Sequence, residues 1–121
     1  ALRPGAIVMD AVYNPPETGH VIMILDNATT AMTGMQEHPG TGRALDHSPA
    51  HRVLFEDLAR SMGINRIHVV DPVKDADSVS NALRECLDSG ELCIIIVRRP
   101  CVLAAAKIRQ YELAAQGGQA Q

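Results

Sequence analysis

The feature that most constrains the fold is a run of five apolar residues at 21–25, which leads directly into Asp26 and Asn27. The run does not alternate with polar residues, and such a run is typical of a parallel strand that is covered on both faces. We therefore expect a buried strand over residues 20–26. A loop rich in Gly, Thr and Pro follows it and extends to Arg43. Because open α/β sheets bind ligands at the carboxyl ends of their strands, we expect the chemistry of this chain in that loop.

Two further apolar runs, at 67–70 and 92–97, predict strands because Val and Ile dominate them and turn residues flank them. Apolar residues at helical spacing predict helices elsewhere. These helices are expected over residues 6–13, 54–62 and 76–89, with Asp75 as the N-cap of the third and Gly90 as its stop. Residues 102–116 are rich in helix formers and predict a helix or a frayed tail. Strands that alternate with helices predict an α/β fold with three layers and a mostly parallel sheet.

The composition supports this fold and argues against several classes of partner. The chain of 121 residues is 46% hydrophobic but has one Phe, two Tyr and no Trp, so its core must be aliphatic. A formal net charge of -3 without a basic cluster argues against nucleic acid and anionic membranes as partners. The sequence has no apolar run of the ~20 residues that span a bilayer and no signal-peptide pattern, so we expect a cytoplasmic location.

The three cysteines, Cys86, Cys93 and Cys101, stand among aliphatic residues without a C-x-x-C pair. This setting predicts buried or half-buried thiols rather than metal ligands. The chain also lacks a run of cysteines that could hold an iron-sulfur cluster. Any iron-sulfur chemistry would therefore need another segment or subunit.

The loop after the first strand carries a long motif. Residues 26–36 read DNATTAMTGMQ, and residues 38–42 read HPGTG. This series resembles the thiamine-pyrophosphate-binding domain of the alpha subunit of indolepyruvate ferredoxin oxidoreductase. Three shorter sequences also match, so that the resemblance covers roughly residues 5–102: DAVYN at 10–14, VVDP at 69–72 and RRPC at 98–101. A Gly, Thr and Pro series of this length is specific, whereas an Asp-Asn pair alone would not be.

The resemblance implies the thiamin diphosphate-binding fold, which is α/β with three layers and a mostly parallel sheet. Residues 1–102 would form the carboxyl-terminal portion of a thiamine-pyrophosphate-binding domain, and residues 103–121 a C-terminal helix and polar tail. Enzymes of this family carry a Gly-Asp motif ahead of the Asp-Asn pair, and no Gly-Asp precedes Asp26. The resemblance therefore implies an N-terminally incomplete fold, in which the first metal-binding carboxylate is missing from this chain.

The resemblance also assigns roles to loop residues. The Asn27 side chain and the Thr29 carbonyl oxygen would bind Mg²⁺, and the loop would bind the diphosphate of thiamine pyrophosphate. His38 would be the catalytic residue, which binds or protonates a 2-oxo acid. The cofactor-binding residues implied are Thr29, Thr30, Ala31, Met32, Thr33 and Gly34.

These residues also have structural interpretations, which the sequence leaves open. Asn27 is common in ordinary turns, Met32 can fill a core instead of lining the cofactor, and His38 can be a surface-loop histidine. Arg43 either pairs with a substrate carboxylate or, as its place in a loop favours, is solvated. His47 has no partner that the sequence identifies.

The implied function is the thiamine pyrophosphate- and Mg²⁺-binding portion of a 2-oxoacid ferredoxin oxidoreductase, which converts indolepyruvate or another aryl pyruvate to acyl-CoA by oxidative decarboxylation. Iron-sulfur clusters on other segments or subunits would pass the electrons to ferredoxin. We expect the isolated chain to be inactive and to form a homodimer or a hetero-oligomer through an exposed strand edge. The alternatives are a non-oxidative thiamine pyrophosphate-dependent 2-oxoacid decarboxylase and a noncatalytic assembly or regulatory domain of the same fold.

Overall fold

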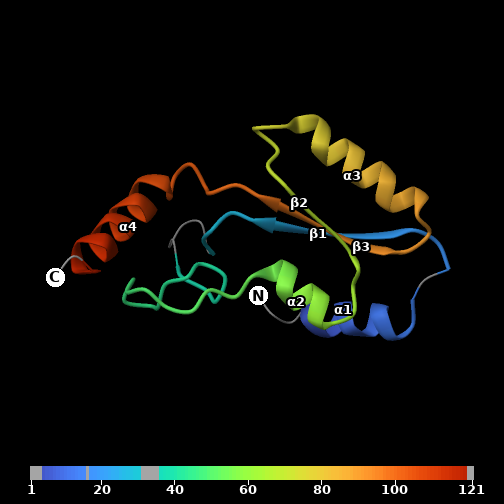
Figure 1. Cartoon of the computed structure of the whole chain (residues 1–121), viewed down its shortest axis with the longest axis horizontal. Helices are drawn as coiled ribbons and strands as arrows, with labels where there is room; N and C mark the ends of the chain where they lie inside the picture. The colour runs from blue at the N-terminus through green and yellow to red at the C-terminus, as the bar shows by residue number, and fades with distance from the viewer. Residues whose placement is uncertain (1–3, 16, 31–35, 120–121) are drawn as a thin grey trace. The chain divides into compact units, whose positions relative to one another are not determined.

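The computed structural model describes residues 4–15, 17–30 and 36–119. Its helices and strands follow one another along the chain as α1 (Pro4–Tyr13), β1 (His20–Asp26), α2 (Phe55–Ser61), β2 (Arg66–Val70), α3 (Ala76–Asp88), β3 (Leu92–Arg98) and α4 (Ala105–Gln119) (Figure 1). The chain forms two compact units. The sheet unit comprises Ala1–Leu25 and Phe55–Arg98, and the loop unit comprises Asp26–Leu54 and Arg99–Gln121.

The three strands form one sheet in the order β1-β3-β2. β2 pairs with β3 in parallel, from Arg66 opposite Cys93 to Val70 opposite Val97. β1 runs in the same direction as β3, because hydrogen bonds join the two strands start to start and end to end. The bonds run from His20 N–H to the Glu91 carbonyl oxygen and from Arg99 N–H to the Asp26 carbonyl oxygen. The predicted parallel sheet is therefore confirmed.

Helices cover both faces of the sheet, as Figure 1 shows with α3 on one side of the strands and α1 and α2 on the other. On the α3 face, the buried side chains are Ala82, Cys86, Cys93 and Ile95. On the α1 and α2 face, they are Val8, Ala59, Ile64, Ile94 and Ile96. Both clusters are aliphatic apart from the two thiols. The three-layer α/β prediction is confirmed, and the buried residues are aliphatic as predicted, although Phe55 packs partly buried against the second cluster.

The expectation that residues 20–26 form a strand buried on both faces is only half right. β1 has the predicted bounds, but Met23 is 45% exposed and Leu25 is 74% exposed. The residues at 93–96 in β3 are at most 1% exposed. The physical reason is the strand order, because β1 lies at an edge of the sheet and β3 lies at its centre. Two apolar runs of similar composition therefore occupy different environments.

The helix ends follow the predicted signals to within a few residues. The Asp75 side chain caps α3 by accepting a hydrogen bond from Ser78 N–H at 3.1 Å, and Gly90 adopts a φ of +69° beyond the helix end. α2 is shorter than the predicted 54–62, since it spans Phe55–Ser61 before Gly63 turns with a φ of +96°. α4 decides between the two predictions for the last stretch in favour of a helix. No helix in the described part of the chain is long and apolar enough to cross a membrane.

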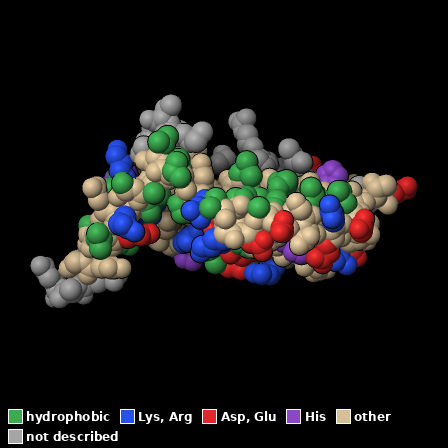
Figure 2. Space-filling model, turned by 90° about the horizontal axis from the view of Figure 1, so that it is seen from above, with side chains coloured by type: hydrophobic (Ala, Val, Ile, Leu, Met, Phe, Trp, Pro, Cys, Tyr) green, Lys and Arg blue, Asp and Glu red, His purple; other side chains and the backbone are tan. Residues whose placement is uncertain are grey.

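The surface mixes charge with exposed apolar side chains. Figure 2 shows Lys and Arg interspersed with Asp and Glu, and hydrophobic side chains between them, on the face that it presents. In the sheet unit, the exposed large apolar residues include Met23, Leu25, Val69 and Val73. Exposed strand edges associate readily with other chains, so association through the edge strand β1 stays a prediction.

Candidate functional site

The polar loop begins at Asn27, whose backbone is held by the segment that follows β3. The carbonyl oxygen of Asp26 accepts the N–H of Arg99 at 3.0 Å, and the carbonyl oxygen of Asn27 accepts the N–H of Cys101 at 2.9 Å. Pro100, which has no N–H, stands between the two donors. The residues after β3 therefore hold the backbone of Asp26 and Asn27 and fix the point at which the loop departs.

Two side-chain hydrogen bonds shape the turn after β1. The Ala28 N–H donates to Asp26 Oδ1 and the Thr29 N–H donates to Asn27 Oδ1, both at 3.3 Å. Ala28 has a φ of +62°, a left-handed conformation that costs a non-glycine residue about 1 to 2 kcal/mol. Such strain persists only where the surroundings enforce it, and it clusters at functional sites. Among the described residues, none donates a hydrogen bond to the carbonyl oxygen of Thr29.

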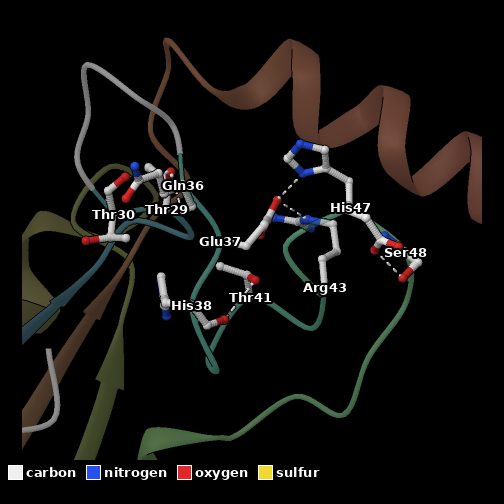
Figure 3. A network of polar contacts seen from close by, with 10 residues as sticks. Thr29, Thr30, Gln36, Glu37, His38, Thr41, Arg43, His47 and Ser48 are labelled. Carbon is white, nitrogen blue, oxygen red and sulfur yellow. Dashed lines mark hydrogen bonds and ion pairs between the residues drawn. The ribbon is translucent and has the colours of Figure 1, made fainter.

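A short bridge then closes the loop on itself. Thr30 and Gln36 exchange two backbone hydrogen bonds of 3.0 Å, and the hydroxyl of Thr29 lies 3.3 Å from the Gln36 carbonyl oxygen that it can donate to. Figure 3 shows these three residues together. The bridge brings the segment that begins at Gln36 beside the turn after β1. Four of the predicted cofactor residues lie between its two sides and outside the described residues: Ala31, Met32, Thr33 and Gly34.

His38 is fixed by the turn that follows it. Its ring Nδ1 accepts the N–H of Gly40 at 3.1 Å, and its carbonyl oxygen accepts both the N–H and the hydroxyl of Thr41 at 2.9 Å. Because Nδ1 is an acceptor, the hydrogen of the neutral imidazole lies on Nε2. Figure 3 shows the ring pointing away from the Glu37 carboxylate. The HPGTG sequence is therefore a turn that orients one imidazole.

The rest of the loop is held by bonds across its width. Three bonds join its later residues to the turn: Val53 N–H to the Pro39 carbonyl oxygen at 2.8 Å, Ala50 N–H to the Gly42 carbonyl oxygen at 2.9 Å and Arg52 Nε–H to the Gly40 carbonyl oxygen at 3.1 Å. Gly42 has a φ of +79°, and a Cβ there would lie 3.4 Å from the Cβ of Arg52. Glycine at this position therefore permits both the backbone conformation and the close approach.

A buried carboxylate lies beside His38 in the chain. The Glu37 side chain is 5% exposed, and its Oε1 receives Arg43 Nε at 2.9 Å and His47 Nδ1 at 3.1 Å. The ring of Tyr111, in α4, stacks on the His47 ring at 4.1 Å between centroids and 6° between planes. The guanidinium carbon of Arg43 lies 5.9 Å from the centre of the same Tyr111 ring. We call these four residues the Glu37 cluster; Figure 3 shows three of them together.

The charge of Glu37 is set by competing effects. Burial alone would raise the pKa of this carboxyl, but the hydrogen bond from Arg43, the nearby Thr41 hydroxyl, the hydrogen bond from His47 and the charge of Arg43 hold the pKa below its ordinary value. Thr41 lies close enough to contribute, although its hydroxyl hydrogen is donated to the His38 carbonyl oxygen. Glu37 Oε2 is consequently buried without a hydrogen-bond partner among the described residues. Glu37 is therefore ionised at neutral pH.

The sequence predictions for this region are partly corrected. Arg43, expected to be solvated, has a side chain only 10% exposed and an ion pair with Glu37, because the loop folds back over it. His47, for which the sequence identified no partner, contacts both Glu37 and Tyr111. Sequence reasoning missed Glu37 and Tyr111 altogether. The available signal was an acidic residue inside a glycine-rich motif, which requires a cation nearby if the motif packs.

The described residues contain no group of three or more His, Cys, Asp and Glu side chains that could hold a metal ion. The candidate ligands in the loop are instead neutral oxygens, namely Asn27 Oδ1 and the Thr29 carbonyl. Asn27 Oδ1 accepts one hydrogen bond and keeps a second lone pair. Hard cations such as Mg²⁺ prefer oxygen ligands of this kind, so these two donors fit Mg²⁺.

Comparison with known proteins identifies a family and several relatives that this chain resembles. Residues 11–97 match the family described as thiamine pyrophosphate enzyme, C-terminal TPP binding domain. The chain is 36% identical over 105 residues to indolepyruvate oxidoreductase subunit IorA of Archaeoglobus fulgidus, covering 87% of this chain and 16% of that protein. It is 37% identical over 94 residues to the subunit of the same name from Pyrococcus horikoshii, covering 78% of this chain and 14% of that protein. The chain thus spans about one sixth of these relatives, and no solved structure matches it.

Proposed function

The chain belongs to the family of C-terminal TPP-binding domains of thiamine pyrophosphate enzymes, and we propose that its loop from Asn27 to Gly34 binds the Mg²⁺-diphosphate of that cofactor. The observation that carries this proposal is the fixed geometry at the end of β1. Backbone bonds from the segment after β3 and a left-handed Ala28 hold Asn27 Oδ1 and the Thr29 carbonyl in one arrangement. Oxygen ligands fixed before binding reduce the ordering cost of holding a metal.

Within this proposal, Asn27 Oδ1 and the Thr29 carbonyl oxygen are the metal ligands of the chain. A carboxylate from outside the described residues completes the set, as the family resemblance implies. Thr30 contributes through its hydroxyl, because its N–H is donated to Gln36. The remaining diphosphate contacts come from Ala31, Met32, Thr33 and Gly34. Bound thiamine pyrophosphate supplies the carbanion chemistry, which no protein side chain can provide.

His38 acts on the 2-oxo acid in this proposal. Its Nδ1 is occupied by the Gly40 N–H, so Nε2–H is the group that donates to a substrate oxygen. A donor fixed by the backbone meets a carbonyl or carboxylate oxygen without having to reorient, which favours binding and stabilises negative charge that develops on that oxygen. The side chain holds a proton at a known atom, and the turn at Gly40–Thr41 keeps that atom oriented.

The complete protein is proposed to be an indolepyruvate or other aryl pyruvate oxidoreductase. Two of the similar proteins are named as indolepyruvate oxidoreductase subunits, which supports both the substrate class and assembly with other subunits. The proposed reaction is oxidative decarboxylation to acyl-CoA, with ferredoxin as the electron acceptor through iron-sulfur clusters on other segments or subunits. We further propose a homodimer or hetero-oligomer in the cytoplasm. The isolated chain, which supplies only part of the metal site, is proposed to be inactive.

The deciding experiment for the metal site is Asn27→Ala in the complete protein. Removing Oδ1 deletes a proposed ligand, so we expect the apparent dissociation constant for thiamine pyrophosphate at fixed Mg²⁺ to rise about tenfold or more. Asn81→Ala is the matched control, because Asn81 is exposed in α3. Isothermal titration measures both. A constant within about twofold of the wild type for Asn27→Ala would rule out Asn27 as a ligand.

The role of His38 is tested separately with His38→Gln. Glutamine retains a polar group but not the imidazole that Gly40 and Thr41 orient, so turnover should fall about 100-fold or more while cofactor affinity stays near the wild-type value. Steady-state rates across 2-oxo acid concentration measure the first, and the cofactor titration above measures the second. Unchanged turnover would assign His38 a purely structural role in the loop.

A further inference from the structure

The Glu37 cluster places buried charges directly beside the proposed catalytic histidine, His38. The Glu37 carboxylate is 5% exposed and Arg43 is 10% exposed, so both charges are largely removed from water. Buried ion pairs seldom stabilise a fold more than an apolar pair of similar volume would. Their directional hydrogen bonds do specify one arrangement of the backbone. The cluster is therefore better suited to fixing geometry than to adding stability.

The cluster reaches from the loop to α4 through a single aromatic ring. Tyr111 stacks flat on His47 and lies under the guanidinium of Arg43, so one ring contacts both partners of the Glu37 carboxylate. An aromatic face favours both a stacked imidazole and a cation above it. The side chain of His47 is 37% exposed, and its backbone has a φ of +68°, which a tight loop must hold in place. Tyr111 therefore supports the two donors that hold Glu37.

Glu37 precedes His38 directly, so the carboxylate fixes the backbone from which the imidazole projects. On the other side of His38, Gly40 and Thr41 hold the ring nitrogen and the carbonyl oxygen. We propose that Glu37 and Tyr111 are positioning residues, which hold the loop so that His38 Nε2 faces the substrate. This inference rests on the proposed function of His38. Tyr111 lies beyond residues 11–97, the region that matches the family, so the match itself gives α4 no role.

The first test measures the loop without any activity. Hydrogen exchange is followed by mass spectrometry on the complete protein, as wild type and as Tyr111→Ala, Tyr111→Phe and Glu37→Gln. Tyr111→Ala and Glu37→Gln should speed exchange in peptides from residues 36–48 about tenfold, because local opening becomes easier. Tyr111→Phe keeps the ring, so its exchange should match the wild type. Unchanged exchange at 36–48 in both Tyr111→Ala and Glu37→Gln would overturn the proposal.

Peptides from β3 serve as the internal control, and Asp57→Asn is the matched charge variant. Asp57 forms an exposed ion pair with Arg60 in α2, and both side chains are more than 60% exposed. Losing that pair should leave exchange at 36–48 unchanged. If Tyr111→Ala also exposes β3, the variant has lost its fold, and Glu37→Gln then decides alone.

The second test separates positioning from general support of the fold. Turnover is measured for Tyr111→Ala, His38→Gln and the double variant. If Tyr111 acts through His38, Tyr111→Ala should lower turnover about tenfold in the wild type but less than about twofold when His38 is already absent. Tyr111→Phe should restore wild-type turnover. Equal losses in both backgrounds would overturn the positioning role. If His38→Gln alone leaves turnover unchanged, the proposed function of His38 fails, and the exchange experiment still decides whether the cluster holds the loop.

Discussion

Different forces stabilise the sheet unit and the loop unit, each within itself. In the sheet unit, the side chains at 93–96 in β3 are at most 1% exposed and pack against helices on both faces. In the loop unit, backbone bonds, two side-chain turn bonds and the Glu37 cluster define the fold. Apolar burial is strong but non-directional, whereas hydrogen bonds are weak in net energy but directional. Changes in the sheet unit should therefore act mainly on stability, whereas changes in the loop unit should also alter geometry and binding.

The largest difference between the units is expected in thiol reactivity. Burial and the neighbouring Cys93 raise the pKa of Cys86 to about 12, from an ordinary value of 9.0. At pH 8, Cys86 therefore carries about a thousandfold less thiolate than a cysteine with the ordinary pKa would, before any effect of solvent access. Cys101, in the loop unit, is only half buried. Iodoacetamide should therefore modify Cys101 much faster than Cys86, because Cys101 is more accessible and the pKa of Cys86 is raised.

Peptide mass spectrometry over a time course measures the two rates, and urea provides the control, since unfolding should equalise them. Comparable rates in the folded protein would mean that the α3 face of the sheet opens readily. The comparison between the units would then fail at its strongest point.

Next in size is the effect of emptying the centre of the sheet. Ile95, in β3, is 0% exposed and its side chain packs on the α3 face of the sheet. Ile95→Ala should therefore lower the free energy of unfolding by about 2 to 5 kcal/mol. Ile95→Val removes one methylene and should cost about 0.5 to 1.5 kcal/mol. Urea denaturation measures both. Cofactor affinity of the folded Ile95→Val protein should be unchanged, and a weaker affinity would show that the two units are not separable in this way.

Most of the sheet unit could be predicted from the sequence because its signals are local. Apolar runs, helical spacing and the caps at Asp75 and Gly90 each report on a few neighbouring residues. What failed was the environment of residues 21–25, since a run of Val, Ile, Met and Leu does not reveal which strand is central. Strand order is decided by contacts between distant segments. Among the strands that the structure describes, β3 has neighbours on both sides, and β1 has one.

The loop unit shows the same limit more strongly. The motif predicts a site between Asp26 and Arg43, but it could not show that the HPGTG turn orients His38 through Gly40 and Thr41. Nor could it connect Glu37 with Tyr111, which lies in a helix far along the chain. The hydrogen-bond partners of a side chain such as Glu37 do not recur at a regular spacing in the sequence, because each contact needs only one donor at the right distance. A resemblance can name a site residue, while the groups that hold it must come from coordinates.

The Glu37 cluster predicts a pH dependence of stability that is moderate in size. The pKa of Glu37 is lowered in the folded state, so its contribution is present above the ordinary value of 4.5 and is lost as the pH falls through the lower folded value. Glu37→Gln keeps the shape but leaves Arg43 without its counter-charge. It should lower the free energy of unfolding at pH 7 by about 2 kcal/mol and flatten its pH dependence below 4.5.

Urea unfolding at several pH values measures this effect. Asp46→Asn is the control, because hydrogen bonds from Ser48 also lower the pKa of the exposed Asp46, and its removal should change the profile less. An unchanged slope below pH 4.5 in Glu37→Gln would contradict an ionised, hydrogen-bonded Glu37.

The smallest effect is expected where the sequence and the structure disagree. Leu25 belongs to the apolar run that predicted a buried strand, yet it is 74% exposed in β1. In the isolated chain, Leu25→Ala should therefore change the free energy of unfolding by less than about 0.5 kcal/mol, in contrast to Ile95→Ala.

In the complete protein the outcome separates two situations. If a partner or another segment covers β1, the same substitution should cost about 2 kcal/mol or more there, because the side chain is then buried. Parallel urea titrations of the chain and the complete protein measure both values. A large loss in the isolated chain would show that Leu25 is buried after all, and that β1 is a second central strand rather than an edge.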